Sequence, residues 1–275
     1  MRKLILAGRT VTTENPAFVM GIVNVTPDSF WKESRGGAEH AMQLIEEGAD
    51  VLDIGGESSR PGAEYVSAEE EIARITPVIR SIRKKSSIPI SIDTRKKKVM
   101  EAAVSEGADI LNDISALEDD DGLGSYAASV KIPVILMHKR GIPAIMQANT
   151  AYENVFAEVD SYLRQRASYA LSCGIPADRL IIDPGIGFGK NLAANVELIR
   201  NCGKLCGGAY PVLMALSRKT CIGEMTGQPV EKRLYGTLAA DILSVQNGAF
   251  MIRVHDAAAA VDTMKVMKYL EGAKN

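Results

Sequence analysis

The sequence predicts an α/β fold in which eight parallel strands alternate with helices. Eight short apolar segments each run into a polar or charged cluster, and stretches with helical spacing of apolar residues separate them. This order is typical of a (β/α)8 TIM barrel, whose functional site lies where the strands lead into the following helices. The polar clusters therefore predict where the site lies. The predicted strands span residues 18–24, 50–54, 88–93, 109–113, 132–138, 180–183, 211–217 and 249–254.

The other elements follow from local patterns. Residues 3–13 alternate weakly between apolar and polar side chains and predict a short N-terminal β-hairpin that covers the bottom of the barrel. A helix over 68–84 begins with Ser67 and Glu70 at the spacing of a capping box, and apolar residues then recur along one face. A second long helix is expected over 152–173.

Length and composition fit one barrel. The chain has 275 residues, so a single domain over 1–275 is expected. Because 32 basic residues nearly balance 34 acidic ones, the net charge of −2 indicates neither nucleic acid nor a membrane as partner. No apolar run reaches the ~20 residues that span a bilayer. The first residues turn polar too early for a signal peptide, and four cysteines are too few for a disulfide scaffold. We therefore expect a cytoplasmic protein.

Three connections that follow strands are longer or richer in glycine than a turn requires, at 25–37, 55–63 and 184–190. Such connections are usually functional lids or binding loops. The third does not match a nucleotide-binding P-loop, because Pro184 and Asn191 stand where that motif needs glycine and Ser or Thr. Its glycines are better explained as turns that let the backbone approach a ligand.

Polar residues end three of the predicted strands at Asp93, Asn112 and Asp183. Asp93 and Asp183 follow apolar runs, so their burial is costly unless hydrogen-bond donors meet them. A ligand with several N–H groups would supply such donors. The alternative is that each Asp caps the following helix.

Cationic residues follow the last two strands, with Ser217, Arg218 and Lys219 after the seventh and Arg253 and His255 after the eighth. These two connections form the habitual phosphate site of the barrel. Arg offers a planar fork for phosphate, and Lys offers a point charge. The alternative is that Lys219 and Arg253 are solvated charges at the rim. Taken together, the strand ends predict a ligand that is rich in N–H groups at one end and phosphorylated at the other.

Seven motifs lie in order along the chain, from Phe18 to His255, and their sequences and spacing resemble the dihydropteroate synthase family. They are MGIVNVTPDSF at 20–30, DIGGESSRPG at 53–62, SIDT at 91–94, LNDI at 111–114, DPGIGFGK at 183–190, SRK at 217–219 and IRVHD at 252–256.

The resemblance implies a homodimeric barrel that joins 6-hydroxymethyl-7,8-dihydropterin pyrophosphate to p-aminobenzoate in folate synthesis. Pyrophosphate would leave first, and the amine would attack the resulting pterin cation. The resemblance further implies Asp93, Lys219 and Arg253 as catalytic residues and a Mg²⁺ ion beside Asn24. The implied substrate-binding residues are Asp93, Asn112, Asp183 and Lys219 for the pterin, Arg253 and His255 for the diphosphate, and Phe30, Ser59, Arg60, Pro61, Phe188 and Lys219 for p-aminobenzoate.

Three positions differ from the usual pattern of the family. Trp31 and the residues after it replace Ser, Asp and glycines, Ala215 stands where glycine is usual, and Ser59 stands where Thr is common. The first difference bears on Mg²⁺ contacts, and the second bears on the width of the pterin pocket. Two other functions therefore remain open: a non-catalytic pterin-binding paralogue, or a methyltetrahydrofolate corrinoid methyltransferase, which would need no diphosphate site.

Four basic residues, Arg95 to Lys98, are expected in the first turn of the helix after 88–93. Positive charge there opposes the helix macrodipole by up to about 1 kcal/mol per residue. We interpret this basic run either as a solvated surface or as charges that attract the two anionic substrates.

Overall fold

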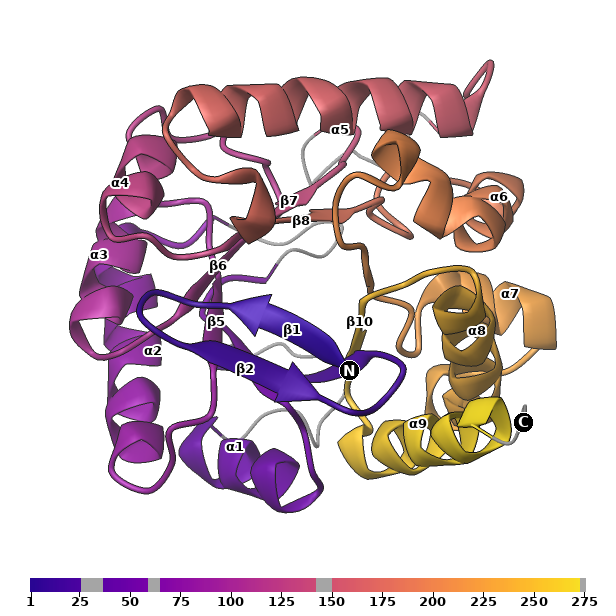
Figure 1. Ribbon diagram of the computed structural model, residues 1–275, viewed down its shortest axis with the longest axis horizontal. Helices are drawn as coiled ribbons and strands as arrows, with labels where there is room; N and C mark the ends of the chain where they lie inside the picture. The colour runs from indigo at the N-terminus through magenta and orange to yellow at the C-terminus, as the bar shows by residue number, and fades with distance from the viewer. Residues whose placement is uncertain (26–36, 59–64, 142–149, 273–275) are drawn as a thin grey trace.

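The computed structural model describes residues 1–25, 37–58, 65–141 and 150–272. From β3 on, each strand is followed by one or more helices, as Figure 1 shows. The strands are β1 (Arg2–Ile5), β2 (Thr10–Thr13), β3 (Phe18–Asn24), β4 (Val51–Gly55), β5 (Ile90–Asp93), β6 (Ile110–Asp113), β7 (Val134–Met137), β8 (Leu180–Asp183), β9 (Leu213–Met214) and β10 (Met251–Val254). The helices are α1 (Gly37–Glu46), α2 (Ala68–Arg83), α3 (Lys97–Ser105), α4 (Leu123–Ser129), α5 (Val155–Ser172), α6 (Leu192–Asn201), α7 (Thr220–Thr226), α8 (Leu234–Gln246) and α9 (Ala257–Gly272).

Within these ranges, β3 to β10 form one parallel barrel surrounded by the helices, so the predicted fold class is confirmed (Figure 1). The order of the strands is β8-β7-β6-β5-β4-β3-β10-β9, and a parallel bridge between Ile182 and Val212 joins the two ends. β3 and β8 have the predicted bounds. None of the helices described here is long and apolar enough to cross a bilayer.

The seventh strand of the barrel is much shorter than predicted. The sequence predicts a strand over 211–217, but β9 ends at Met214, where its ladder with β10 stops. Beyond this point the amide of Lys219 donates to the carbonyl of Leu216, and Arg218 has a φ of 55°. A left-handed residue does not fit a parallel strand. The prediction was too long because the apolar run continues into the turn that carries Arg218 and Lys219.

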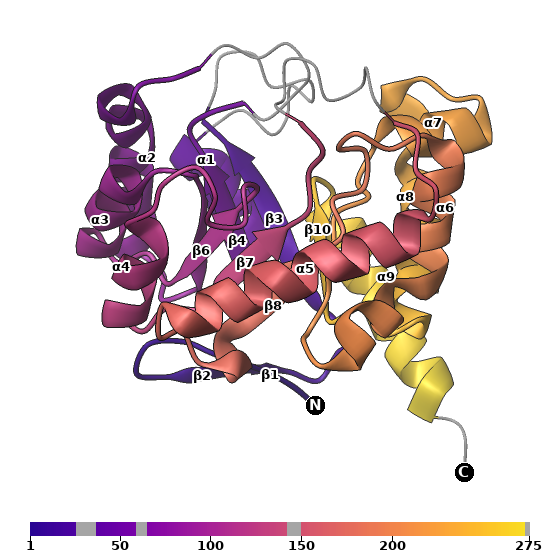
Figure 2. The ribbon, with the colours of Figure 1, turned by 90° about the horizontal axis from the view of Figure 1, so that it is seen from above.

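The hairpin β1-β2 covers the lower end of the barrel, as predicted (Figure 2). Leu4 and Leu6 are buried and pack with residues that fill the barrel, among them Phe18, Met20 and Leu213. The lower end is therefore part of the core, and the opposite end is left for the site.

The outer faces of the strands pack against the helices in two further apolar clusters. In α2, Ser67 accepts a hydrogen bond from the amide of Glu70 at 3.2 Å, as its capping-box spacing predicts. Ile75, Ile79 and Ile82 of this helix are buried. The apolar stripe of α2 is thus core.

Replacing Leu6 by Ala should lower the free energy of unfolding by about 2–5 kcal/mol, the usual cost of truncating a buried Leu. Leu6 is 1% exposed, whereas Leu171 on α5 is 42% exposed. Leu171→Ala is therefore the control and should change the free energy by less than about 0.5 kcal/mol. Urea denaturation measures both. Equal losses would contradict the role of the hairpin in closing the core.

Candidate active site

A cavity of about 580 Å³ lies at the C-terminal ends of the barrel strands. Its volume is in the range of small-molecule sites. Every predicted site residue within the described ranges lines it: Asn24, Asp93, Asn112, Asp183, Phe188, Lys219, Arg253 and His255. The other predicted site residues, Phe30, Ser59, Arg60 and Pro61, lie outside the described residues, as does Trp31.

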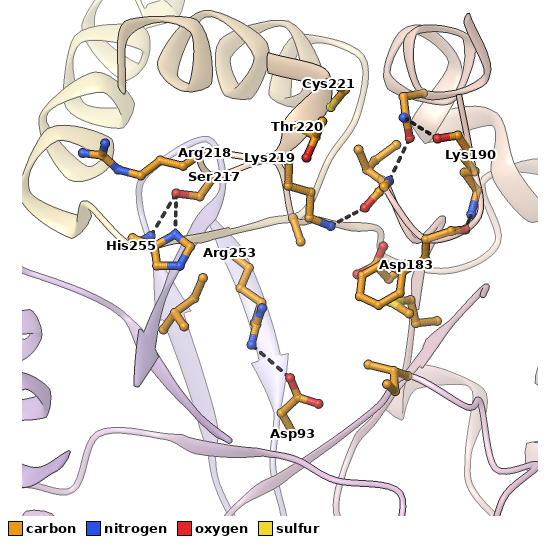
Figure 3. A pocket seen from close by; sticks show the side chains of 18 of the residues that line it. Asp93, Asp183, Lys190, Ser217, Arg218, Lys219, Thr220, Cys221, Arg253 and His255 are labelled. Carbon is orange, nitrogen blue, oxygen red and sulfur yellow. Dashed lines mark hydrogen bonds and ion pairs between the residues drawn. The ribbon is translucent and has the colours of Figure 1, made fainter. Parts of the chain in front are cut away.

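Arg253 on β10 connects two carboxylates of neighbouring strands. Its Nε donates to Oδ2 of Asp53 at 2.6 Å, and its Nη2 donates to Oδ2 of Asp93 at 3.1 Å (Figure 3 shows the second bond). Nδ2 of Asn112 donates to the same oxygen of Asp53 at 3.0 Å. Asp53 is fully buried. It therefore orients both Arg253 and Asn112 from behind the cavity.

Sequence reasoning assigned no role to Asp53. The available signal was a single acid within the apolar strand 50–54, which is costly to bury without a cation. A buried acid in an apolar strand indicates that Asp53 has a partner, but it does not identify Arg253 as that partner.

Asp93 faces the cavity from the end of β5. Burial raises the pKa of Asp93 to about 7, the charge of Arg253 opposes this rise, and the charge of Asp53 adds to it. Near neutral pH, Asp93 therefore exists both as a carboxylate and as a carboxylic acid, so it can accept or donate a hydrogen bond.

Neither Asp93 nor Asp183 caps the following helix, so that alternative is wrong for both. Helix α3 has Lys96 at its N-cap, and α6 is capped by Asn191, whose side chain accepts from the amide of Ala194. Asp183 is buried, and its Oδ1 instead accepts from the amide of Gly185 at 2.6 Å. Burial raises the pKa of Asp183, and the charge of Lys219 opposes this rise.

Lys219 extends toward the carbonyl of Ile186, to which its ammonium donates a hydrogen bond (Figure 3). The ammonium also lies 4.9 Å from the ring centroid of Phe188. Burial lowers the pKa of Lys219 to about 8, and the charge of Asp183 opposes this shift. Arg253 is bound to two acids and only 18% exposed. Neither cation is a solvated rim charge, so that alternative is also wrong.

Lys190 organises the glycine-rich connection after β8, a role that the sequence did not reveal. Its buried ammonium lies 2.9 Å from Nδ1 of His138 and donates to the carbonyls of Gly185 and Phe188 at 2.9 and 3.0 Å. Burial and the charge of Lys190 lower the pKa of His138 to about 3, so the imidazole is neutral and accepts from the ammonium. A Cβ on Gly185 would lie 1.9 Å from the carbonyl oxygen of His138, so only glycine fits there.

Ser217 fixes His255 beside Arg253. Its Oγ accepts from the amide of His255 at 3.1 Å and lies 3.0 Å from Nδ1 of the same residue (Figure 3). Arg218, in contrast, donates to both oxygens of Asp256 at 2.8 and 2.7 Å. Arg218 therefore supports the turn, and His255 lines the cavity together with the cation Arg253.

The cavity thus brings together buried acids, an amide and cations, but the acids and the cations do not lie on opposite sides as expected, because Arg253 binds Asp93 and the charge of Asp183 acts on Lys219. A family model described as pterin binding enzyme matches residues 20–255. The dihydropteroate synthase of Neisseria meningitidis serogroup B is 43% identical over 278 residues, which cover 96% of each chain. The chain belongs to the dihydropteroate synthase family.

Solved structures of this family align over almost the whole chain. The Xanthomonas albilineans dihydropteroate synthase with 4-aminobenzoic acid has a TM-score of 0.90 and 44% identity, covering 98% of both chains. The same enzyme in complex with 7,8-dihydropteroate has a TM-score of 0.85 and 41% identity, covering 99% of this chain and 100% of that one. The predicted family is confirmed, and the corrinoid methyltransferase alternative is wrong.

The family resemblance of the sequence implies that this chain binds Mg²⁺ beside Asn24. In the described part of the chain, no group of three or more His, Cys, Asp or Glu side chains is placed to hold a metal ion. Asn24 ends β3 and lines the cavity with Arg253 and His255. Mg²⁺ in enzymes is commonly bound through one or two carboxylates together with substrate phosphates. Asn24 offers an amide oxygen, a ligand of the oxygen type that this ion requires, in place of a carboxylate.

The basic run Arg95 to Lys98 is bound to acids. Arg95 and Lys96 are largely buried, and both contact Glu57. Lys97 and Lys98 are more exposed, and their ammonium groups lie 3.6 and 3.8 Å from carboxylates of Glu101 and Glu69. Both predicted interpretations are therefore wrong for Arg95 and Lys96, because their charges are neither solvated nor free to attract substrates.

The stability of Asp93→Asn relative to the parent should rise with pH. The folded-state pKa of Asp93, about 7, lies above its unfolded value. Such a group contributes stability that is present below the unfolded pKa, about 3.9, and lost as pH rises through the folded pKa. Asn does not ionise. The difference in free energy of unfolding, variant minus parent, should therefore grow between about pH 4 and 7 and then level off.

Urea denaturation across this pH range measures the difference. Asp262→Asn is the control, because its side chain is 77% exposed. That variant should show no such pH dependence. A flat difference for Asp93→Asn would contradict the raised pKa.

Proposed function

We propose that this chain joins 6-hydroxymethyl-7,8-dihydropterin pyrophosphate to p-aminobenzoate and releases 7,8-dihydropteroate and pyrophosphate. The observation that carries the proposal is the presence of two sets of polar groups in one cavity. Asp93, Asn112 and Asp183 line it as hydrogen-bonding partners, and Lys219 and Arg253 line it as cations. A pterin with N–H groups at one edge and a diphosphate at the other complements both sets.

The pterin would bind to Asp183 and Asn112. Asp183 would accept from the amino and N3–H groups, since a buried carboxylate needs such donors. Asn112 would also contact the pterin. Its side-chain amide is held in a fixed orientation by the hydrogen bond that it donates to Asp53 at 3.0 Å. Lys219 lies over the ring of Phe188, which we assign to p-aminobenzoate, and the charge of Asp183, which we assign to the pterin, acts on its pKa. Lys219 would therefore lie between the two substrates.

The reaction would begin with departure of pyrophosphate. Arg253 and His255 would hold the diphosphate, and Asp93 would stabilise the positive charge that develops on the pterin. A Mg²⁺ ion, held by Asn24 and the diphosphate, would supply further neutralisation of the leaving group. The amine of p-aminobenzoate would then attack from the pocket that we assign to Phe188, Lys219, Phe30, Ser59, Arg60 and Pro61.

We further propose that the chain is a homodimer. The support is a set of exposed apolar side chains on α7, α8 and α9, which lie on one side of the molecule (Figure 1). Exposed apolar side chains on neighbouring helices favour coverage by a partner. They are Met225, Tyr235, Leu243, Val266, Tyr269 and Leu270.

The purified chain with both substrates and Mg²⁺ should form dihydropteroate and release pyrophosphate. Asp183→Asn should weaken pterin binding about 10- to 100-fold, because it removes a charged acceptor from a buried N–H edge. Asp178→Asn is the control, because Asp178 is exposed and precedes the N-terminal end of β8, away from the cavity. Calorimetric titration measures affinity. Unchanged affinity would exclude Asp183 from the site, and pterin binding without turnover would indicate the non-catalytic paralogue.

Arg253→Ala should weaken binding of both the pterin diphosphate and a pterin without phosphates, whereas His255→Ala should weaken only the diphosphate. The reason is that Arg253 also holds Asp93, on the pterin side. The same titration with each ligand, on variants whose folding is verified by circular dichroism, separates the two roles. If the two variants lose affinity for the two ligands in the same proportion, the separate roles of Arg253 and His255 are contradicted.

A further inference from the structure

The glycine-rich connection between β8 and α6, residues 184–190, carries two contacts of the site. The carbonyl of Ile186 accepts a hydrogen bond from the ammonium of Lys219, and the ring centroid of Phe188 lies 4.9 Å from the same ammonium. Three glycines of this connection have a positive φ, between 65° and 83°: Gly185, Gly187 and Gly189. Glycine has no side chain to pack and has the greatest backbone freedom. The placement of both contacts therefore depends on groups outside the turn.

Lys190, at the far end of this connection, folds back and holds it. Its side chain is only 3% exposed, and its Nζ donates to the carbonyls of Gly185 and Phe188 at 2.9 and 3.0 Å. In the sequence, these two carbonyls lie on either side of the Ile186 carbonyl that binds Lys219. The third partner of Nζ is Nδ1 of His138, which follows β7, at 2.9 Å. Lys190 thus ties both ends of the segment to each other and to a neighbouring strand.

Two other side chains each hold a single backbone group of the connection. Oδ1 of Asn195 on α6 accepts from the amide of Gly187 at 2.8 Å, and the hydroxyl of Tyr152 donates to the carbonyl of Gly189 at 3.0 Å. Lys190 binds two backbone groups at once. Its loss should therefore free more of the connection than the loss of either neighbour.

The protonation state of Lys190 does not alter this role. Burial lowers the pKa of Lys190 to about 7, and the charge of Asp183 opposes this shift. The neutral amine retains two N–H donors. Both carbonyls therefore stay bound whether or not Lys190 is charged.

We propose that Lys190 is a positioning residue that fixes the Ile186 carbonyl and the Phe188 ring against Lys219, and so fixes the boundary between the two substrates. The inference rests on the proposed function, in which Lys219 lies between the pterin and p-aminobenzoate. Figure 3 shows the two lysines on either side of the connection. Fixing these groups before binding reduces the ordering cost of binding. Loss of Lys190 should therefore weaken the binding of both substrates at Lys219.

The proposed contacts to the diphosphate do not depend on Lys190. Arg253 donates to Asp53 at 2.6 Å, and the amide of His255 donates to Ser217 at 3.1 Å. Loss of Lys190 should therefore leave the affinity for inorganic pyrophosphate unchanged. A general loss of structure would weaken all the ligands alike, so this selectivity separates positioning from stability.

The test compares Lys190→Met with Lys204→Met. Both variants replace an ammonium by an apolar group, but Lys204 is exposed and contacts Asn201 at the C-terminal end of α6. Lys190→Met should raise the KM for p-aminobenzoate and the Kd of a pterin without phosphates at least about fivefold. The Kd of inorganic pyrophosphate with Mg²⁺ should stay within about twofold of the parent. Lys204→Met should change none of them.

Lys190→Gln is the second variant. It retains two N–H donors on a shorter side chain, so it should give the same selectivity with smaller increases. If Lys190→Met does not fold, this variant decides the test.

Constants in the Lys190 variants equal to those in Lys204→Met overturn the inference. An equal loss for all three ligands with a lower melting temperature also overturns it, because that is the result of a purely structural role. If the parent makes dihydropteroate and only the selectivity is absent, the proposed function stands and the inference falls. If the parent neither makes dihydropteroate nor binds the pterin in calorimetry, both fall.

Discussion

The site depends on the ion pair between Asp53 and Arg253. Asp53 is fully buried in β4, and Arg253 reaches it from β10, 200 residues along the chain. Breaking a buried pair by removing one partner typically costs about 3–5 kcal/mol, because the remaining charge is left uncompensated. Arg253 is therefore fixed, and so are the groups that depend on it, Asp93 on β5 and, through Asp53, Asn112 on β6.

This arrangement makes the cavity nearly self-neutralising before any ligand binds. Arg253 lies between two acids. Lys219 faces Asp183, and the charge of Asp183 opposes the lowering of the pKa of Lys219 by burial. A ligand that brought only an anion would compete with these acids for the cations. A ligand with both donors and an anion can satisfy the two sets together, which favours the whole pterin diphosphate over either of its halves.

The sequence predicted the positions at strand ends well, because the carboxyl ends of parallel strands must meet on one face of the barrel. Asp93, Asp183 and Lys219 line one cavity for this reason. It did not reveal Asp53 or Lys190 as parts of the site, since each depends on a partner far along the chain that spacing does not indicate. The ion pairs of the basic run, Arg95 to Lys98, could not be predicted for the same reason. Its acids Glu57 and Asp119 lie 38 and 24 residues from Arg95.

The same arrangement occurs twice around the cavity. Asp53 and Glu71 are fully buried acids, each bound to a cation that also binds an acid lining the cavity. Arg253 connects Asp53 to Asp93, and Lys96 connects Glu71 to Glu57. Because the inner acid cannot be left unpaired at low cost, its cation cannot turn away, and the orientation of the outer acid is thereby fixed. This also explains a basic residue at the start of α3, where the helix dipole disfavours it, since the ion pairs of Lys96 outweigh a cost of up to about 1 kcal/mol.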